Sequence, residues 1–292
     1  MSEAHPDEVQ PLFHGQGSYA IGTTVEPTEI DGNRRYDLDD GISFISPKKD
    51  RKEPATYYRW IIDAVGEHTE HGTKNKNTCV RVEFADGHHI DLPTYWMDKE
   101  EDEPVPQLGH LARGWRTSDP RAFVRWFRER RDPKLVRLVK YYKALFDYQK
   151  EHVGKLPSGF VMTILIESYR DESERDDVCV ANTASRILIA LRSNGFSCYR
   201  PTPDTSEDLL ADPSADRISA FSDLLDRVRD EGTKATNNPN QLAACEIWSS
   251  LFGPRFSCVT ANDELESANQ YERPPVTKST AKSACSQSSR KR

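Results

Sequence analysis

The sequence lacks any apolar run approaching the roughly 20 residues that cross a bilayer, so we expect no membrane span. Its first eight residues are acidic and contain neither the basic nor the apolar region of a signal peptide, so we expect no secretory leader. The 292 residues are enough to bury a sizeable core, as one large or two modest domains. Charged residues make up 30% of the chain, which predicts a soluble, rather polar protein.

Cysteine is sparse and scattered. The six cysteines form no C-x-x-C pair, which argues against a structural zinc site and against a disulfide scaffold. We therefore expect the protein in a reducing cytoplasm. The six positions are Cys79, Cys179, Cys198, Cys245, Cys258 and Cys285.

Two common nucleotide-binding signatures are also missing. There is no G-x-x-x-x-G-K-[ST] motif and no G-x-G-x-x-G after a predicted strand, so P-loop and Rossmann folds are poor interpretations. The net charge is −7, which argues against a protein that binds long nucleic acid over its whole surface. Local basic patches can still serve small anionic substrates.

The most informative stretch is Tyr36-Asp37-Leu38-Asp39-Asp40-Gly41. In an extended strand, Asp37 and Asp39 point to the same face and Asp40 points away. Two carboxylates held this close repel each other unless a cation lies between them. Oxygen-only ligands of this kind suit Mg²⁺, which takes its remaining ligands from water and substrate phosphates.

Two further features belong to the same pattern. Gly17-Ser18 offers a small-residue turn where backbone N–H groups can approach a phosphate. Ala85-Asp86-Gly87 separates two alternating runs, which predicts a hairpin that brings Asp91 beside the strand of Asp37 and Asp39. A phosphate turn facing three aspartates is suited to metal-assisted nucleotidyl transfer. The adjacent His88-His89 pair suggests zinc, but we interpret both as surface residues of the hairpin because only one could face Asp91's cluster.

The second half of the chain reads as helical. Ser118-Asp119-Pro120 and Asp132-Pro133 each place a capping side chain before a proline at the first helical position. In the second of these helices Lys143 borders the apolar stripe, so its ammonium can be held in a cleft and neutralise triphosphate charge. The arginine-rich stretch 125–131 is read as a solvated helix face rather than a nucleic-acid patch. Helices are predicted at 57–65, 160–169, 178–191, 218–229 and 240–252. The sequence also predicts a short strand and turn at 12–20, a polar loop at 28–35, a strand at 36–45 and the hairpin at 75–95.

Together these residues resemble the cGAS/DncV-like nucleotidyltransferases, bacterial relatives of cGAS and oligoadenylate synthase that act in anti-phage (CBASS) signalling. The resemblance rests on Gly17-Ser18-Tyr19, Gly22-Thr23, the stretch 36–41 and His89-Ile90-Asp91-Leu92-Pro93, and extends more loosely from residue 12 to 257. It implies that Lys143 and Ser158 contact the triphosphate. Ser158 opens a helix, and a hydroxyl beside free N–H groups at a helix start binds anions.

The resemblance also implies the architecture. We expect an α+β protein in which a polymerase-β-like lobe, a mixed sheet with helices, joins a helical C-terminal lobe with the active site in the cleft between them. The expected divisions are a flexible segment at 1–11, a catalytic core at 12–115, a helical lobe at 116–258 and a disordered tail at 259–292. Relatives usually place a long spine helix before the Gly-Ser turn, and residues 1–11 have no room for one.

The activity implied is synthesis of a cyclic di- or trinucleotide second messenger from NTPs (ATP, GTP or a pyrimidine nucleotide), with Mg²⁺ or Mn²⁺ held by Asp37, Asp39 and Asp91. A separate effector protein would read the product, and a regulatory partner is a further expectation. Two alternatives stay open. One is a linear transferase that adds a nucleotide to RNA or a small molecule, and the other is a non-catalytic nucleotide-binding module.

Overall fold

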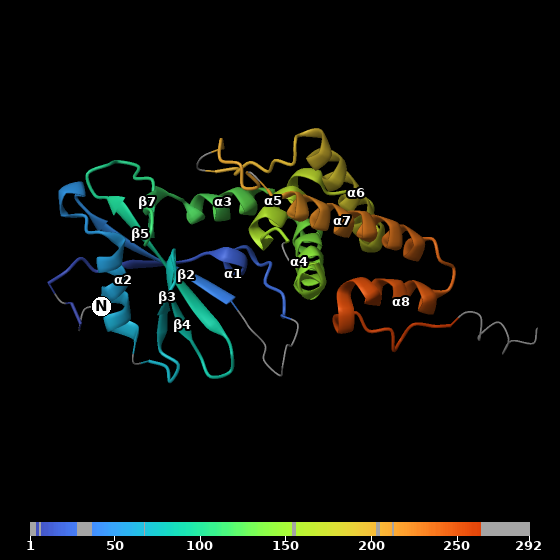
Figure 1. Cartoon of the computed structure of the whole chain (residues 1–292), viewed down its shortest axis with the longest axis horizontal. Helices are drawn as coiled ribbons and strands as arrows, with labels where there is room; N and C mark the ends of the chain where they lie inside the picture. Colours follow the sequence, from blue (N-terminus) through green and yellow to red (C-terminus); the bar gives the residue numbers. More distant parts are fainter. Residues whose placement is uncertain are drawn as a thin grey trace, which may run out of the picture.

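The computed structural model describes residues 4–263 except 6, 28–36, 67, 154–155, 203–204 and 212. The chain forms a sheet-containing lobe and a helical lobe side by side, which confirms the predicted α+β architecture (Figure 1). The predictions for the loop at 28–35, for residues 1–3 and for the tail beyond residue 263 lie outside the described residues. In the described part of the chain, no helix is both long and apolar enough to span a membrane.

In the first lobe, the described residues form a mixed sheet of seven strands, in the order β1-β2-β5-β4-β3, with β6 and β7 continuing from β5. The pair β2–β5 is parallel and the other pairs are antiparallel. The expected hairpin is present as β4 and β5, joined through residues 84–88. The strands are β1 (Leu12–Gly15), β2 (Asp37–Ser46), β3 (Thr73–Asn75), β4 (Cys79–Glu83), β5 (His89–Asp98), β6 (Gln107–His110) and β7 (Gly114–Thr117).

The two faces of this sheet differ because side chains alternate along each strand. One face buries an apolar cluster against α2 (Pro54–Val65), which supplies four large side chains to it. Phe44 is fully buried there and lies 4.5 Å, ring to ring, from Tyr57 of α2. The opposite face carries the odd-numbered residues of β2 and β5, which include Asp37, Asp39 and Asp91.

The helical lobe has one large core drawn from all of its long helices. The predicted caps are formed: Asp119 accepts hydrogen bonds from Arg121 N and Ala122 N, and Asp132 accepts one from Leu135 N. The helices are α3 (Pro120–Arg130), α4 (Pro133–Val153), α5 (Gly159–Tyr169), α6 (Asp176–Ser193), α7 (Ala215–Thr236) and α8 (Gln241–Phe252), with short 3-10 turns at Lys48–Asp50 and Gly253–Arg255.

A short helix, α1 (Gly17–Ile21), joins the lobes. Ile21 is buried in the core of the helical lobe, and Arg128 Nη2 of α3 donates a hydrogen bond to Ala20 O over 3.2 Å. On the other side, Tyr95 Oη of β5 donates to Gln16 Oε1 over 3.1 Å. The Gly-Ser turn is therefore tied to both lobes.

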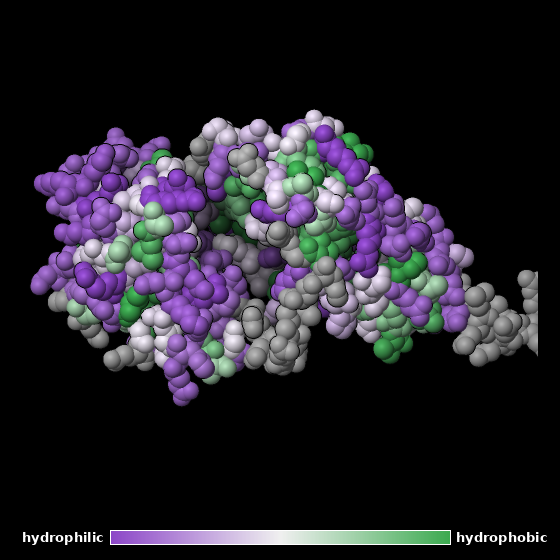
Figure 2. Space-filling view, in the orientation of Figure 1, coloured by the Kyte–Doolittle hydropathy of each residue, from purple (hydrophilic) through white to green (hydrophobic). Residues whose placement is uncertain are grey.

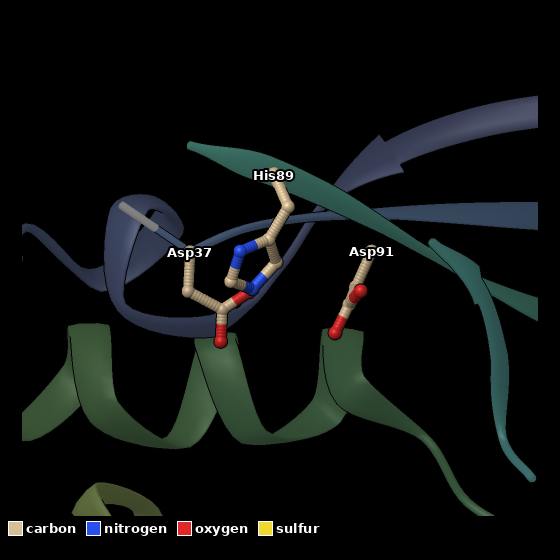
Figure 3. A group of neighbouring side chains, drawn as sticks. All are labelled: Asp37, His89 and Asp91. Atoms are coloured by element: carbon tan, nitrogen blue, oxygen red, sulfur yellow. The ribbon is translucent and has the colours of Figure 1, made fainter. Parts of the chain in front are cut away.

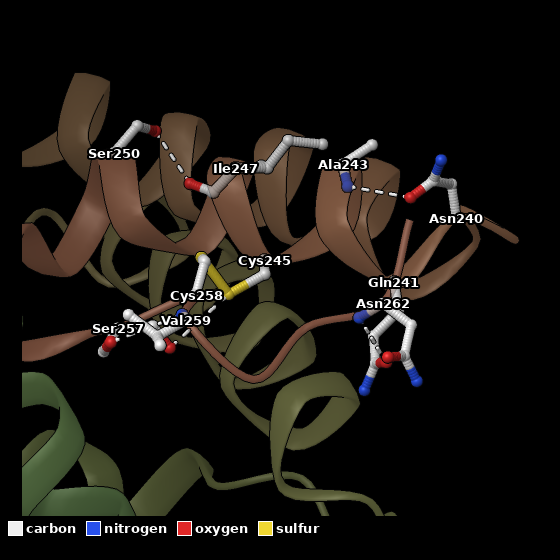
Figure 4. Close-up of a disulfide and its surroundings, with 10 residues drawn as sticks. All are labelled: Asn240, Gln241, Ala243, Cys245, Ile247, Ser250, Ser257, Cys258, Val259 and Asn262. Atoms are coloured by element: carbon white, nitrogen blue, oxygen red, sulfur yellow. Dashed lines mark hydrogen bonds between the residues drawn. A yellow bond between two sulfur atoms is a disulfide. The ribbon is translucent and has the colours of Figure 1, made fainter. Parts of the chain in front are cut away.

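The scattered cysteines predict no disulfide scaffold, and the structure nevertheless contains one disulfide among the described residues. Cys245 of α8 is bonded to Cys258, which pins the segment after α8 back onto that helix (Figure 4). Cys79, Cys179 and Cys198 are free and buried. Disulfides persist mainly in oxidising compartments, so this bond removes the cysteine-based argument for a reducing one.

Candidate active site

The three aspartates singled out in the sequence lie on one face of two neighbouring strands. Asp39 of β2 is the register partner of Asp91 of β5. Asp37 lies two residues before Asp39 on the same face, and Asp40 alternates to the other. The parallel pairing of β2 and β5 therefore gathers the three predicted carboxylates.

The close approach of the three carboxylates changes the pKa of Asp39. Burial, followed by the neighbouring carboxylates of Asp37 and Asp91, raises the pKa of Asp39 from 3.8 to about 6. The positive charges of Lys143 and Arg81 oppose this rise. A carboxylate that the protein alone satisfies poorly is suited to accept a cation.

Gly17 has a geometric reason to be glycine. Its φ is +62°, in the left-handed region, and a Cβ built at this position would overlap the carboxylate of Asp39. The predicted phosphate turn is thus the first turn of α1, packed directly against the acidic face. Ser18 adjoins it, and Ser18 O accepts a hydrogen bond from Thr23 N over 2.9 Å.

Arg81 is a site neighbour that the sequence analysis missed. It lies across from Asp91 on β4, and its Nε and Nη2 each donate to one Asp91 oxygen over 2.7 Å. This bidentate pair fixes the orientation of the carboxylate and offsets its charge. The signal was available, because the predicted hairpin turn sets Arg81 opposite Asp91.

His89 is the second residue that was missed, and the interpretation of it as a surface residue is wrong. Its side chain is 15% exposed, and its Nε2 lies 3.2 Å from Asp37 Oδ1. Ligand atoms of Asp37, His89 and Asp91 all lie within 4.8 Å of one another (Figure 3). His88 does stay at the hairpin turn, where its ring stacks on Phe84 with centroids 4.1 Å apart.

A cavity of about 770 Å³ opens in front of Asp37 and Asp39. Figure 2 shows the hollow between the two lobes, with hydrophilic and hydrophobic side chains around it. Gly17 and Ser18 line it from the sheet lobe. From the helical lobe it is lined by Lys143, Ser158, Phe160 and Arg200, among others.

Lys143 lies on the opposite wall from the acidic face, as predicted. Its Nζ donates to Thr23 O over 3.0 Å, which holds the ammonium in the cavity. Burial lowers its pKa from 10.5 to about 8, although the carboxylates of Asp39 and Asp37 favour the charged form. The ammonium is therefore partly desolvated, which strengthens its attraction for an anion.

Ser158 is the N-cap of α5, and its Oγ accepts a 3.4 Å hydrogen bond from Val161 N. The hydroxyl hydrogen remains available to donate toward the cavity that Ser158 lines. Gly159 follows and lies beside the Lys143 stem, since a Cβ built at Gly159 would be in van der Waals contact with Lys143 Cε at 3.4 Å. Donors on one wall and carboxylates on the other make the cavity suited to a cation-bound polyphosphate.

Comparison with known proteins agrees with this geometry. Residues 11–95 match the family described as "Cyclic GMP-AMP synthase DncV-like, nucleotidyltransferase domain". The GTP-bound form of Vibrio cholerae DncV is 22% identical, with a TM-score of 0.72 over 91% of this chain and 73% of that one.

Two further structures share the fold. V. cholerae DncV in complex with the linear intermediate 5′ pppA(3′,5′)pG is 20% identical, with a TM-score of 0.68 over 85% of this chain and 69% of that one. CdnC of E. coli MS115-1, in a CdnC:HORMA-deltaN complex, is 13% identical, with a TM-score of 0.68 over 88% of this chain and 86% of that one. The two-lobe fold expected from the sequence is thus confirmed.

Proposed function

Residues 11–95 form a nucleotidyltransferase domain of the DncV-like family, and on this premise we propose that the chain joins NTPs into a cyclic di- or trinucleotide with release of pyrophosphate. The product serves as a second messenger in anti-phage defence. The sheet lobe at 12–115 carries the acidic residues, and the helical lobe at 116–258 closes the nucleotide cavity from the other side.

One observation carries this proposal. The cavity between the lobes has carboxylates on one wall, at Asp37 and Asp39, and a desolvated ammonium on the other, at Lys143. A nucleoside triphosphate with its divalent cation has the complementary charge pattern, with the cation on one side of the phosphates and bare oxygens on the other. A binding-only protein would gain little from clustered carboxylates that repel one another without a cation.

The donor set fits Mg²⁺, with Mn²⁺ able to substitute. Asp37, Asp39 and Asp91 offer carboxylate oxygens on one sheet face. The other two carboxylates destabilise the ionised form of Asp39, and a bound cation would offset this repulsion. These three residues would hold the ions. When bound, such ions lower the pKa of the attacking ribose hydroxyl and balance the charge on the pyrophosphate leaving group.

The chain's own residues position the substrate. Gly17 and Ser18 hold the triphosphate from the sheet side, and Lys143 and Ser158 hold it from the helical side. Because Lys143 is already fixed to Thr23 O, little side-chain order has to be gained when the phosphates arrive. Arg81 keeps the Asp91 carboxylate oriented. Catalysis comes from positioning and charge stabilisation, with no covalent enzyme intermediate.

The partners follow from the reaction. The substrates are ATP, GTP or a pyrimidine nucleotide, which are abundant in the cytoplasm, where we place the protein. A separate effector reads the product. The CdnC relative is described in a complex with HORMA-deltaN, which supports a regulatory partner for this chain as well.

The test is product analysis. Purified protein is incubated with labelled NTPs and Mg²⁺ or Mn²⁺, treated with phosphatase and resolved by chromatography. Phosphatase removes terminal phosphates and leaves phosphodiesters intact, so the treated product is identified by its mass. A product with as many phosphates as nucleosides supports the cyclase, because ring closure leaves no terminal phosphate to remove. A product with fewer phosphates than nucleosides, or a nucleotide joined to RNA or a small molecule, identifies the linear transferase instead. Nucleotide binding with no product at all identifies the binding module.

A further inference from the structure

The acidic face contains an imidazole in addition to its three carboxylates. β2 and β5 are parallel and in register, so that Asp37 pairs with His89 just as Asp39 pairs with Asp91. Directly paired residues of adjacent strands point to the same face of a sheet. The four side chains therefore form a two-by-two array, in which His89 lies beside Asp37 and Asp91 lies beside Asp39.

From this array we infer that His89 Nε2 is a nitrogen ligand of the cation held by Asp37 and Asp91. The inference rests on the proposed function and adds a residue to its metal site. A cation bound by the Asp37 and Asp91 carboxylates and the His89 imidazole would have both nitrogen and oxygen ligands. A nitrogen ligand makes the site less selective for Mg²⁺, because Mg²⁺ prefers oxygen ligands and imidazole suits first-row transition ions.

The distances agree with ligation. His89 Nε2 and Asp37 Oδ1 are 3.2 Å apart. Two adjacent ligands of an octahedral ion, each about 2.1 Å from it, are separated by about 3.0 Å. Asp91 supplies a third ligand atom within 4.8 Å of the other two. In Figure 3 the imidazole of His89 lies beside the Asp37 carboxylate, on the side to which Asp91 also points.

The two ends of the array also differ in how many hydrogen bonds and ion pairs their carboxylates make with the rest of the protein. At the Asp91 end, Arg81 donates one hydrogen bond to each carboxylate oxygen, which fixes the carboxylate and leaves each oxygen a further lone pair for a cation. At the Asp37 end, the next residue across the sheet is Glu83, whose carboxylate is paired with Lys74 at 2.6 Å. Asp37 is 57% exposed, so the open end of the array is the one that contains His89.

The test uses the full chain, free of any histidine tag, with Mn²⁺ alone as the probe. Pulsed EPR of bound Mn²⁺ detects a ¹⁴N nucleus in its coordination sphere, and continuous-wave EPR gives the Mn²⁺ affinity. The variants are His89→Gln and, as the matched control one residue away, His88→Gln.

We expect ¹⁴N coupling in the wild type, its loss in His89→Gln with at least about a tenfold weaker Mn²⁺ affinity, and no change in His88→Gln. Bound Mn²⁺ without ¹⁴N coupling in the wild type, or coupling that persists in His89→Gln, would overturn the role of His89. The absence of ¹⁴N coupling in the wild type overturns the inference even if His89→Gln fails to fold.

The Asp37→Asn/Asp39→Asn double variant separates this inference from the proposed function. If Mn²⁺ affinity is unchanged in that variant, the acidic face is not the metal site and the proposed function itself fails. If affinity falls there while the wild type lacks ¹⁴N coupling, only the ligation by His89 fails.

Discussion

Asp39→Asn should make the metal-free protein more stable while abolishing its activity. The pKa of Asp39 is raised from 3.8 to about 6 by burial and by two neighbouring carboxylates. Since one pKa unit corresponds to about 1.36 kcal/mol, the ionised carboxylate costs up to about 3 kcal/mol near neutral pH. The group is partly solvated, so we expect Asn to recover about 1–2 kcal/mol of unfolding free energy.

The sign of the pH dependence follows from which state holds the proton. Between pH 3.8 and about 6 the folded protein keeps a proton on Asp39 that the unfolded chain has released. Wild-type stability from this group therefore falls as pH rises through that window, and the penalty is complete above it. The difference between the variant and the wild type should be largest above pH 6 and vanish near pH 4.

Urea unfolding in EDTA at pH 7.5 and at pH 4.5 measures this difference. Asp40→Asn is the matched control, because it removes a carboxylate one residue away on the other face of β2. Adding Mn²⁺ should then stabilise the wild type more than Asp39→Asn, since the variant has lost one of the three carboxylates proposed to hold the ions. A variant less stable than the wild type at pH 7.5 would refute the view that the acidic face is strained by unbalanced charge.

Three further predictions test separate parts of the account. Gly17→Ala should abolish nucleotidyl transfer and lower unfolding free energy by at least about 1 kcal/mol, whereas Gly15→Ala, which meets no atom within 4 Å, should behave as wild type in the same assays. Lys143→Gln should raise the KM for NTP about 10–100-fold, as expected for a lost charged hydrogen bond, and an unchanged KM would show that the phosphates bind elsewhere. The kcat/KM of the wild type should fall above pH 8, because Lys143 loses its proton there. Cys245→Ser should lower the unfolding free energy by about 3 kcal/mol under non-reducing conditions and should have no effect in reductant. Equal denaturation midpoints for the variant and the wild type without reductant would show that the disulfide does not form in solution.

Much of the site could be predicted because strand alternation and one hairpin fix its geometry. The spacing of Asp37 and Asp39 sets them on one face, and the Asp86-Gly87 turn returns the chain so that Asp91 lies beside them. The same alternation sets Asp40 on the opposite face of β2 from Asp37 and Asp39. Lys143 could be found because it borders an apolar stripe on a long helix.

The role of His89 depends on pairing between strands that are far apart in the sequence. The offset that pairs Asp37 with His89 belongs to the parallel β2–β5 ladder, and no turn in the sequence specifies it. Arg81 could have been found, since the hairpin alone sets it opposite Asp91. The disulfide could not, because cysteine spacing does not fix connectivity.

Above all we propose that the acidic face performs metal-dependent nucleotidyl transfer, whatever the final product. Pyrophosphate release from NTPs measures that step directly, in the wild type, in Asp37→Asn/Asp39→Asn and in the Asp40→Asn control. We predict release that requires a divalent cation, is lost in the double variant and is retained in the control. Equal release from the wild type and the double variant, or no release from wild-type protein that has bound NTP and cation, would contradict the claim.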